Sequence, residues 1–195
     1  MTSERPFSQA CENNKGPILA VLQQHCQVGG TLLEIGAGTG QHAAWLSAQL
    51  PHLKWQPSDV ADNLPGVRQW LQEPESRALP PLELDVSGRW PDQQFDYLFT
   101  ANTLHIMSRE EVVSFITAGC EHLKDKGCFV VYGPFKVAGH FTSGSNARFD
   151  EWLKDIDPQR GIRDQEWIEE LFSRQQRELV AEYDLPANNK VLVFG

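Results

Sequence analysis

The stretch that decides the fold reads Leu-Leu-Glu-Ile-Gly-Ala-Gly-Thr-Gly and occupies residues 32–40. Its apolar start predicts a buried strand over residues 31–35, and the alternating glycines predict a tight turn after it. A helix is predicted directly after the turn, over residues 41–50. Glycines between a strand and a helix let backbone N–H groups approach a ligand closely. This stretch therefore predicts a ligand-binding loop.

Strand-like and helix-like segments alternate along most of the chain. The predicted strands are 31–35, 53–58, 82–86, 95–101 and 128–132, and the predicted helices are 17–27, 41–50, 67–71 and 109–123. This alternation predicts parallel strands joined by right-handed helical crossovers, with helices on both faces of the sheet. The fold class is thus α/β, of the doubly wound or Rossmann-like kind.

The end of the chain follows a different pattern. A helical region is predicted over residues 146–176, and two strands follow at 178–185 and 190–194. Only Pro-Ala-Asn-Asn joins these two strands, whereas a parallel crossover needs a dozen or more residues. The last two strands are therefore predicted to be antiparallel neighbours at one side of a mostly parallel, seven-stranded sheet.

The composition limits the kinds of molecule that we expect this protein to bind. A chain of 195 residues with 41% hydrophobic content can bury one core, so we expect a single domain over residues 1–195. The 26 acidic and 17 basic residues give a net charge of -9, which repels phosphate backbones and anionic membranes. We expect a small molecule or a protein as partner, and neither nucleic acid nor membrane.

The cysteines and the N-terminal residues bear on location. Cys11, Cys26, Cys120 and Cys128 form no Cys-x-x-Cys pair, which indicates free thiols and predicts neither a metal site nor a disulfide scaffold. Residues 1–8 lack the apolar core of a signal peptide, and the chain has no run of about 18 apolar residues. A cytoplasmic location is predicted.

The residues around the glycine loop discriminate between ligands. A phosphate-binding P-loop needs Gly-Lys-Ser/Thr, whereas Gln41 and His42 follow Gly40 here. A dinucleotide loop needs Gly-x-Gly-x-x-Gly, and Gln41 occupies its last position. Glu34 suits a cation better than a pyrophosphate. A ligand with an ammonium, a sulfonium and a nucleoside satisfies both the acid and the glycines, which points to S-adenosylmethionine.

On these residues the chain resembles the class I S-adenosylmethionine-dependent methyltransferases, and the resemblance spans nearly the whole chain. The matching first motif is Glu34, Gly36, Ala37, Gly38 and Gly40. The resemblance implies that Asp59, which ends the second strand, binds the ribose hydroxyls. It also implies that Asp85 and Val86, after the third strand, receive the adenine. A strand-ending Asp is also common as a helix cap or a turn residue, and that alternative stays open for each acid.

More narrowly, the chain is similar to an uncharacterised methyltransferase-like family of bacteria and animals with no assigned substrate. The residues that carry this similarity are 7–8, 10–15, 17–19, 55–59, 101–102, 105–106, 132–135, 142–146, 149–150, 161–164 and 186–189.

The ends of the fourth and fifth strands supply candidate catalytic residues. Methyl transfer depends mainly on positioning, and a base helps when the acceptor is a hydroxyl. His105 is the predicted base, with packing at the turn as its alternative. Ala101 and Asn102 are predicted to contact the cofactor, and Asn102 either orients the acceptor or only forms the turn. Tyr132 is predicted to hydrogen-bond the acceptor, whereas Lys136 attracts an anion or is a solvated charge.

Two segments are predicted to cover the site. Residues 1–28 form an N-terminal flap and helix, in which Asn14 or Lys15 meets the methionine carboxylate of the cofactor; a solvated lead-in is the alternative. Residues 136–176 form a lid and helical insertion, with a mobile, glycine- and hydroxyl-rich loop at 138–146. Asn146 is predicted to cap the following helix, whose Phe149 and Trp152 face inward.

The sequence as a whole predicts an S-adenosylmethionine-dependent methyltransferase acting on a small molecule. Two alternatives stay open. A cofactor-binding scaffold or sensor without activity would be favoured by exposed aromatic surface from Trp45, Trp70 or Trp90. An NAD(P)-dependent oxidoreductase is disfavoured by Glu34 and Gln41. Neither the acceptor nor the oligomeric state follows from the sequence.

Overall fold

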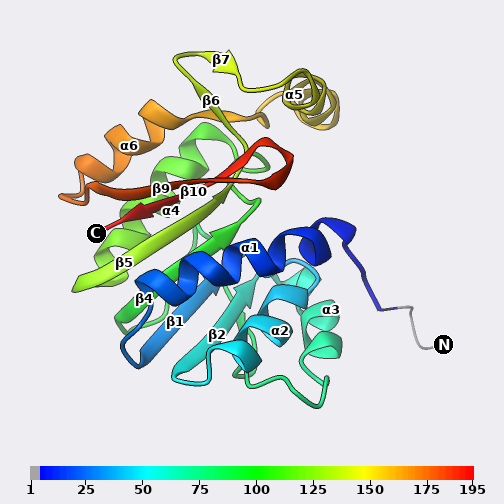
Figure 1. The fold of residues 1–195 in the computed structure, drawn as a ribbon, viewed down its shortest axis with the longest axis vertical. Coiled ribbons are helices and arrows are strands. Elements are labelled where there is room, and N and C mark those ends of the chain that lie inside the picture. Colours follow the sequence, from blue (N-terminus) through cyan, green and yellow to red (C-terminus); the bar gives the residue numbers. More distant parts are fainter. Residues whose placement is uncertain (1–4) are drawn as a thin grey trace.

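A computed structural model describes residues 5–195, and its centre is a seven-stranded sheet (Figure 1). The strands are β1 Gly30–Ile35, β2 Leu53–Asp59, β3 Leu82–Glu83, β4 Phe95–Ala101, β5 Leu123–Gly133, β9 Leu179–Leu185 and β10 Asn189–Phe194. Their order is β3-β2-β1-β4-β5-β10-β9. The first five are parallel, and β10 is antiparallel to both β5 and β9. The predicted fold, with its antiparallel C-terminal pair, is confirmed.

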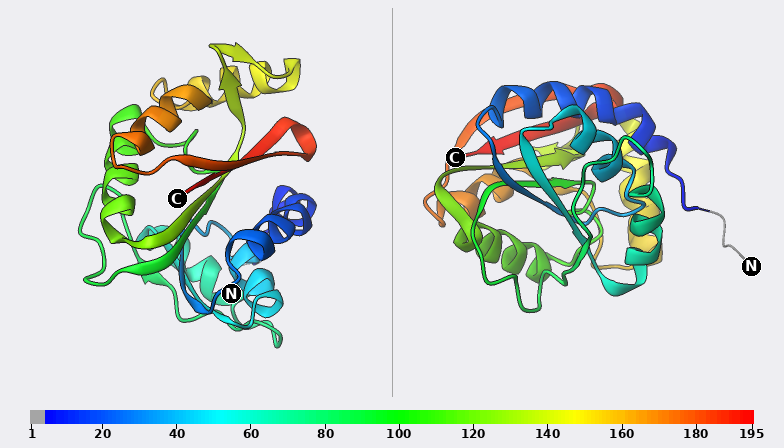
Figure 2. Two further views of the ribbon diagram at one scale, coloured as in Figure 1. Left: turned by 60° about the vertical axis from the view of Figure 1, so that its left-hand side comes forward. Right: turned by 90° about the horizontal axis from the view of Figure 1, so that it is seen from below.

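Helices cover both faces of the sheet, and each face has its own core. One face packs against α1 (Gln9–His25) and α2 (Gln41–Gln49), and the other against α4 (Arg109–His122) and α6 (Gln165–Ser173). Seen along the sheet in Figure 2, α1 in blue and α4 in green lie on opposite sides of the strands. Successive strand residues alternate between the cores: Leu32 lies in the core with α1 and α2, and Leu33 in the core with α4.

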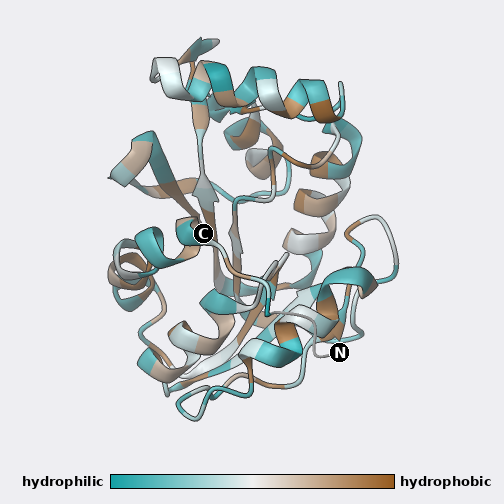
Figure 3. Cartoon of the chain, turned by 90° about the vertical axis from the view of Figure 1, so that its right-hand side faces the viewer, coloured by the Kyte–Doolittle hydropathy of each residue, from teal (hydrophilic) through white to brown (hydrophobic). Residues whose placement is uncertain are grey.

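The helices are amphipathic, as helices with one buried face should be. Figure 3 shows hydrophobic and hydrophilic segments alternating along them. The remaining helical elements are α3 (Leu64–Trp70), α5 (Gly144–Ile156) and the short 3₁₀ turns η1 (Ala61–Asn63) and η2 (Pro186–Asn188). Within residues 5–195, no helix combines the length and the apolar content needed to cross a bilayer.

The first helix begins at Gln9, earlier than the predicted start at Pro17. The Ser8 hydroxyl accepts a hydrogen bond from the Cys11 N–H at 3.4 Å and caps the helix. The polar block at 11–15 therefore lies inside α1, and the alternative of a solvated lead-in is wrong. Residues 1–4 of the predicted flap at 1–28 lie outside the described residues.

The third strand is shorter than the predicted 82–86. After Glu83 the chain turns away from the sheet, because the Asp85 carboxylate accepts a hydrogen bond from the Ser87 N–H at 2.9 Å. The Gly88 N–H also donates to the Asp85 carbonyl at 2.9 Å. Asp85 thus forms the turn that the sequence left open as an alternative.

The segment at 136–176 is a mixed insertion and not one helical region. It contains α5 and α6, and also β7 (His140–Phe141) and β8 (Arg163–Asp164), which flank β6 (Phe135–Val137) in a small second sheet ordered β7-β6-β8. In Figure 1, β6, β7 and α5 stand together above the main sheet. The predicted loop at 138–146 is therefore partly strand β7 and the start of α5, and its mobility stays a prediction.

Candidate functional site

The glycine loop follows β1 at the point where the strand order reverses between β1 and β4, which is where doubly wound sheets bind ligands. Gly36, Gly38 and Gly40 all have positive φ, at 73°, 58° and 91°. A Cβ on Gly36 would lie 2.4 Å from Thr103 Cγ2, so this glycine lets the loop pack on the turn after β4. A Cβ on Gly38 would meet open space, and Gly38 is exposed. The loop therefore leaves room for a ligand at Gly38.

Asp59, at the end of β2, is held against this loop. One carboxylate oxygen accepts a hydrogen bond from the Gly38 N–H at 2.6 Å. The other accepts from the Val60 N–H and the Asn63 amide, both at 2.8 Å. The structure thus brings the predicted ribose-binding acid to the predicted loop. Contact with a ribose stays a prediction.

Glu34 lies at the base of the loop and is almost fully buried, with 1% of its surface exposed. Its carboxyl accepts a hydrogen bond from the indole Nε1–H of Trp55 at 2.7 Å. Burial raises the pKa of Glu34 to about 8, against the effect of the Trp55 hydrogen bond and with help from the nearby Asp59 charge. Glu34 is therefore mostly protonated at neutral pH, and a cation next to it would favour the charged form.

Four of the predicted site residues line one cavity of about 630 Å³. They are Asn14, Asn102, His105 and Tyr132. The cavity lies beyond the carboxyl ends of β4 and β5 and under α5, and its volume is in the usual range for small-molecule sites. The structure thus brings together, around one cavity, predicted site residues from α1, from β5 and from the turn after β4, and their roles stay predictions.

Hydrogen bonds fix the polar side of the cavity. The Asn14 side chain bonds the ring Nε2 of His42 at 2.7 Å, and the Tyr132 hydroxyl accepts from the Asn189 amide at 2.8 Å. Asn102 adopts a left-handed conformation with φ of 61°, and its N–H donates to the Tyr132 carbonyl at 2.9 Å. Asparagine tolerates this conformation better than most residues. Asn102 therefore both forms the turn and lines the cavity.

His105 follows β4 and is 7% exposed. Its ring meets Phe149 edge to face, with centroids 5.1 Å apart. Burial, with a smaller effect of the Arg163 and Arg160 charges, lowers the pKa of His105 to about 4. The ring is therefore neutral at neutral pH and has a nitrogen free of a proton. This nitrogen can accept a proton, but a pKa of about 4 makes it a weak base, and the contact with Phe149 shows that the residue also packs.

Other predicted residues lie apart from this cavity. Lys15 pairs with Glu12, and its Nζ lies 5.2 Å from the ring centroid of Trp45, in a separate cavity of about 450 Å³. The structure thus separates Lys15 from Asn14. Lys136 pairs with Asp164 at 3.5 Å.

The predicted adenine pair also lies outside the 630 Å³ cavity. Asp85 is exposed in its turn, and Val86 is half-buried, with its carbonyl accepting from the indole of Trp90 at 3.1 Å. Contact of either residue with an adenine stays a prediction.

The helix α5 and the loop after it supply residues whose part in the site the sequence did not reveal. The Phe149 and Trp152 rings stack at 5.7 Å, but Trp152 is 56% exposed at the cavity, and its predicted inward orientation is wrong. Arg160 also lines the cavity. No motif marks Arg160, because its loop reaches the site only through the tertiary fold.

The described part of the chain has no group of three or more His, Cys, Asp or Glu side chains placed to hold a metal ion. The cysteines Cys11, Cys26, Cys120 and Cys128 are free thiols.

Comparison with known families identifies the family to which the chain belongs. The family model described as "Protein of unknown function (DUF938)" matches residues 5–195. The chain belongs to the DUF938 family.

Solved structures similar to this DUF938 protein share its fold. An O-methyltransferase family protein from Burkholderia thailandensis matches with a TM-score of 0.83 and 15% identity, over 95% of this chain and 57% of that one. Mitomycin 7-O-methyltransferase MmcR matches with a TM-score of 0.81 and 15% identity, over 95% of this chain and 53% of that one. Human N-acetylserotonin methyltransferase, solved in complex with SAM, matches with a TM-score of 0.78 and 15% identity, over 95% of this chain and 52% of that one. The DUF938 chain thus spans little more than half of each, and a class I methyltransferase-like fold is what these matches establish.

Proposed function

We propose that this DUF938 protein is an S-adenosylmethionine-dependent methyltransferase with a small-molecule acceptor. The observation that carries the proposal is the Asp59 carboxylate on the Gly38 N–H, at 2.6 Å, where the loop opens to solvent. A carboxylate there can accept ribose hydroxyls, and Gln41 at the last loop position disfavours a dinucleotide. The names of the similar solved structures, one of them in complex with SAM, support the same cofactor.

The chain's own residues fit this cofactor at several points. The loop residues Gly36, Ala37, Gly38 and Gly40 would hold it together with Asp59, and Ala101 and Asn102 would adjoin its reactive end. Asn14 lines the larger cavity and is better placed than Lys15 to meet the methionine carboxylate. Asp85 and Val86 keep the adenine role that the family resemblance implies.

The acceptor would lie in the 630 Å³ cavity. S-adenosylmethionine would supply an electrophilic methyl group to the acceptor's nucleophilic atom and leave as S-adenosylhomocysteine. Asn102 and Tyr132 orient the acceptor through hydrogen bonds. Neutral His105 accepts the proton that an acceptor hydroxyl releases.

The alternatives have less support. A non-catalytic scaffold predicts exposed tryptophans and a pocket too small for an acceptor. Trp90 is instead buried, Trp45 and Trp70 are half-buried, and the cavity is of acceptor size. An oxidoreductase would need a dinucleotide loop, which Gln41 interrupts. The cytoplasmic location and the absence of nucleic-acid and membrane partners stay predictions from composition.

Binding calorimetry with S-adenosylmethionine, its demethylated product S-adenosylhomocysteine, and NAD tests the proposal. Asp59→Asn should weaken both sulfur nucleosides by roughly ten- to a hundred-fold, as expected for loss of a charged hydrogen-bond acceptor. Asp92→Asn is the matched control, because Asp92 is exposed in the loop before β4 and is not among the residues of the cavities at the glycine loop or beyond β4 and β5. Circular dichroism confirms that each variant is folded. Binding of NAD alone, or of none of the three by the folded protein, would overturn the proposal.

A further inference from the structure

Arg160 is a cation whose side chain lacks a bonding partner in the described residues. It lies between α5 and β8 and lines two cavities, the 630 Å³ cavity and a smaller one of about 310 Å³. Its Nε is buried, and no acceptor within residues 5–195 bonds it. A buried guanidinium N–H without an acceptor costs free energy, so such a group points to a bound ligand.

The neighbouring cations are all engaged. Arg163 donates to the carbonyls of Leu104 at 3.1 Å and Gln159 at 2.9 Å, and also to that of Met107. It therefore clamps the turn that carries His105.

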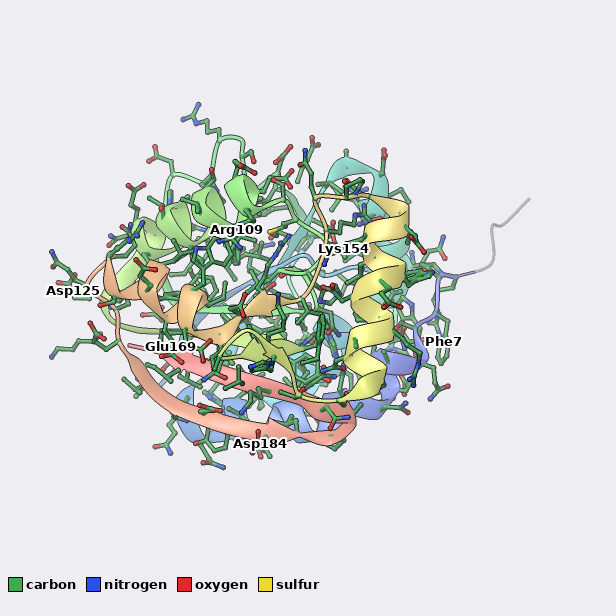
Figure 4. The ribbon with its side chains drawn as sticks, turned by 90° about the horizontal axis from the view of Figure 1, so that it is seen from above. Phe7, Arg109, Asp125, Lys154, Glu169 and Asp184 are labelled. Carbon is green, nitrogen blue, oxygen red and sulfur yellow. The ribbon has the colours of Figure 1, made fainter. Side chains whose placement is uncertain are left out.

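The remaining cations of the smaller cavity also have partners. Lys154 pairs with Asp150 at 2.6 Å, and the Arg109 guanidinium lies 3.8 Å from the ring centroid of Trp167. Figure 4 shows Lys154 on α5 and Arg109 at the start of α4, on either side of this region. Within residues 5–195, Arg160 is the only Lys or Arg that lines the 630 Å³ cavity, so it is the cation that an anion bound there would meet.

An aromatic surface lies in the same cavity as Arg160. The rings of Phe149 and Trp152 stack at an interplanar angle of 17°, and Trp152 keeps 56% of its surface exposed. Both come from α5, which borders the site along one side in Figure 4. A large, flat apolar surface at a cavity suits a planar aromatic ligand.

We propose that the acceptor is a planar aromatic compound with a carboxylate, whose ring packs against Phe149 and Trp152 and whose carboxylate binds Arg160. The identification of this compound as the methyl acceptor rests on the proposed function, whereas the binding site itself is inferred from the cavity and its residues. The guanidinium matches a carboxylate with two parallel N–H donors. In a protein with a net charge of -9, an anionic ligand needs such a local cation.

The site would also link acceptor binding to the state of His105. The Arg160 charge is one of the causes that lower the pKa of His105. Burial is the largest of these causes and Arg160 the smallest, so a carboxylate on Arg160 would raise the pKa of His105 only slightly.

Calorimetry with naphthoate and with its uncharged amide, naphthamide, tests the inference in the presence of saturating S-adenosylhomocysteine. We expect the wild type to prefer naphthoate by roughly ten-fold or more, as for a charge-assisted pair. Arg160→Gln should remove this preference and leave naphthamide binding unchanged. Trp152→Ala should weaken both compounds by the same factor, because both share the ring.

Arg148→Gln is the control, because Arg148 is exposed on α5 and is not among the residues of the cavity. It should leave both affinities unchanged. Equal binding of naphthoate by the wild type and Arg160→Gln, or binding of neither compound, would overturn the inference while binding of S-adenosylhomocysteine keeps the proposed function. If S-adenosylhomocysteine itself does not bind, the naphthoate series is run without it. An Arg160-dependent preference then supports the carboxylate site although the proposed function fails.

Discussion

At the scale of single residues, the buried Glu34 carboxyl makes stability depend on pH. Its pKa is raised to about 8 in the folded protein from an ordinary value near 4.5. The stability contributed by the protonated form is therefore complete below the ordinary pKa and is lost as the pH rises through about 8. Glu34→Gln keeps an acceptor for the Trp55 indole and has no proton to lose. We expect the free energy of unfolding of the wild type to fall by on the order of 2 kcal/mol more than that of Glu34→Gln between pH 6 and pH 8.

Urea unfolding of both proteins at several pH values measures this difference. Other titrating groups, His42 and His105 among them, are common to both proteins and cancel in the comparison. Glu83→Gln removes an exposed carboxyl from β3 and should follow the wild type. Parallel curves for Glu34→Gln and the wild type would show that the carboxyl is charged in the folded protein. If Glu34 also binds the cofactor, the more stable variant should bind it more weakly.

Single site residues were predictable where a local pattern marks them. The glycine loop and Asp59 follow from their places at the ends of β1 and β2, and the structure joins them. The Trp55 hydrogen bond to Glu34 was not predictable, because it links neighbouring strands whose register the sequence does not show. Arg160 was not predictable for the same kind of reason, since it reaches the cavity only after α5 is in place.

At the scale of elements, the start of α4 holds the turn that carries Asn102 and His105. Ser108 caps the helix: its hydroxyl accepts from the Glu111 N–H at 3.1 Å, and its own N–H donates to the Glu111 carboxylate at 2.6 Å. This reciprocal pair is a capping box. We expect Ser108→Ala to lower the free energy of unfolding by about 1 kcal/mol, measured by urea unfolding.

Ser114→Ala is the matched control for the cap. Ser114 is exposed in the middle of α4, where alanine is the better helix former, so this variant should be as stable as the wild type or slightly more stable. An equal loss in both variants would mean that the cap contributes nothing beyond the general cost of changing serine on this helix.

Helices and strands were predictable where a long apolar pattern determines them, and less predictable where a turn interrupts the pattern. The helix over 109–123 and the strand over 95–101 agree closely with α4 and β4, because their apolar periodicity is long. The end of β3 was missed because the Asp85 turn interrupts a run of alternating apolar and acidic residues that is typical of a strand. The small sheet of β6, β7 and β8 was missed because β6 and β7 are very short and β8 pairs with β6 only across α5, which separates them in the chain.

At the scale of the whole molecule, one sheet divides two apolar cores that share every central strand. Leu32 and Leu33 are neighbours on β1, fully buried, and belong to different cores. If residues 5–195 fold as the predicted single domain, a substitution that weakens one core should lower the free energy of unfolding of the whole domain, including the other core. The position of the site supports this expectation, since its loop, its cavity and α5 draw on elements from both faces of the sheet.

Leu32→Ala and Leu33→Ala test the coupling of the two cores. Each removes buried apolar volume and should lower the free energy of unfolding by about 2–5 kcal/mol. Each should also keep a single transition that coincides when followed by tryptophan fluorescence and by circular dichroism, because β1 carries both cores. Val180→Ala, at an exposed position on β9, should change the free energy by less than about 0.5 kcal/mol. Two separate transitions, with each leucine variant shifting only one of them, would mean that the faces unfold independently, and the site between them would then open whenever either core melts.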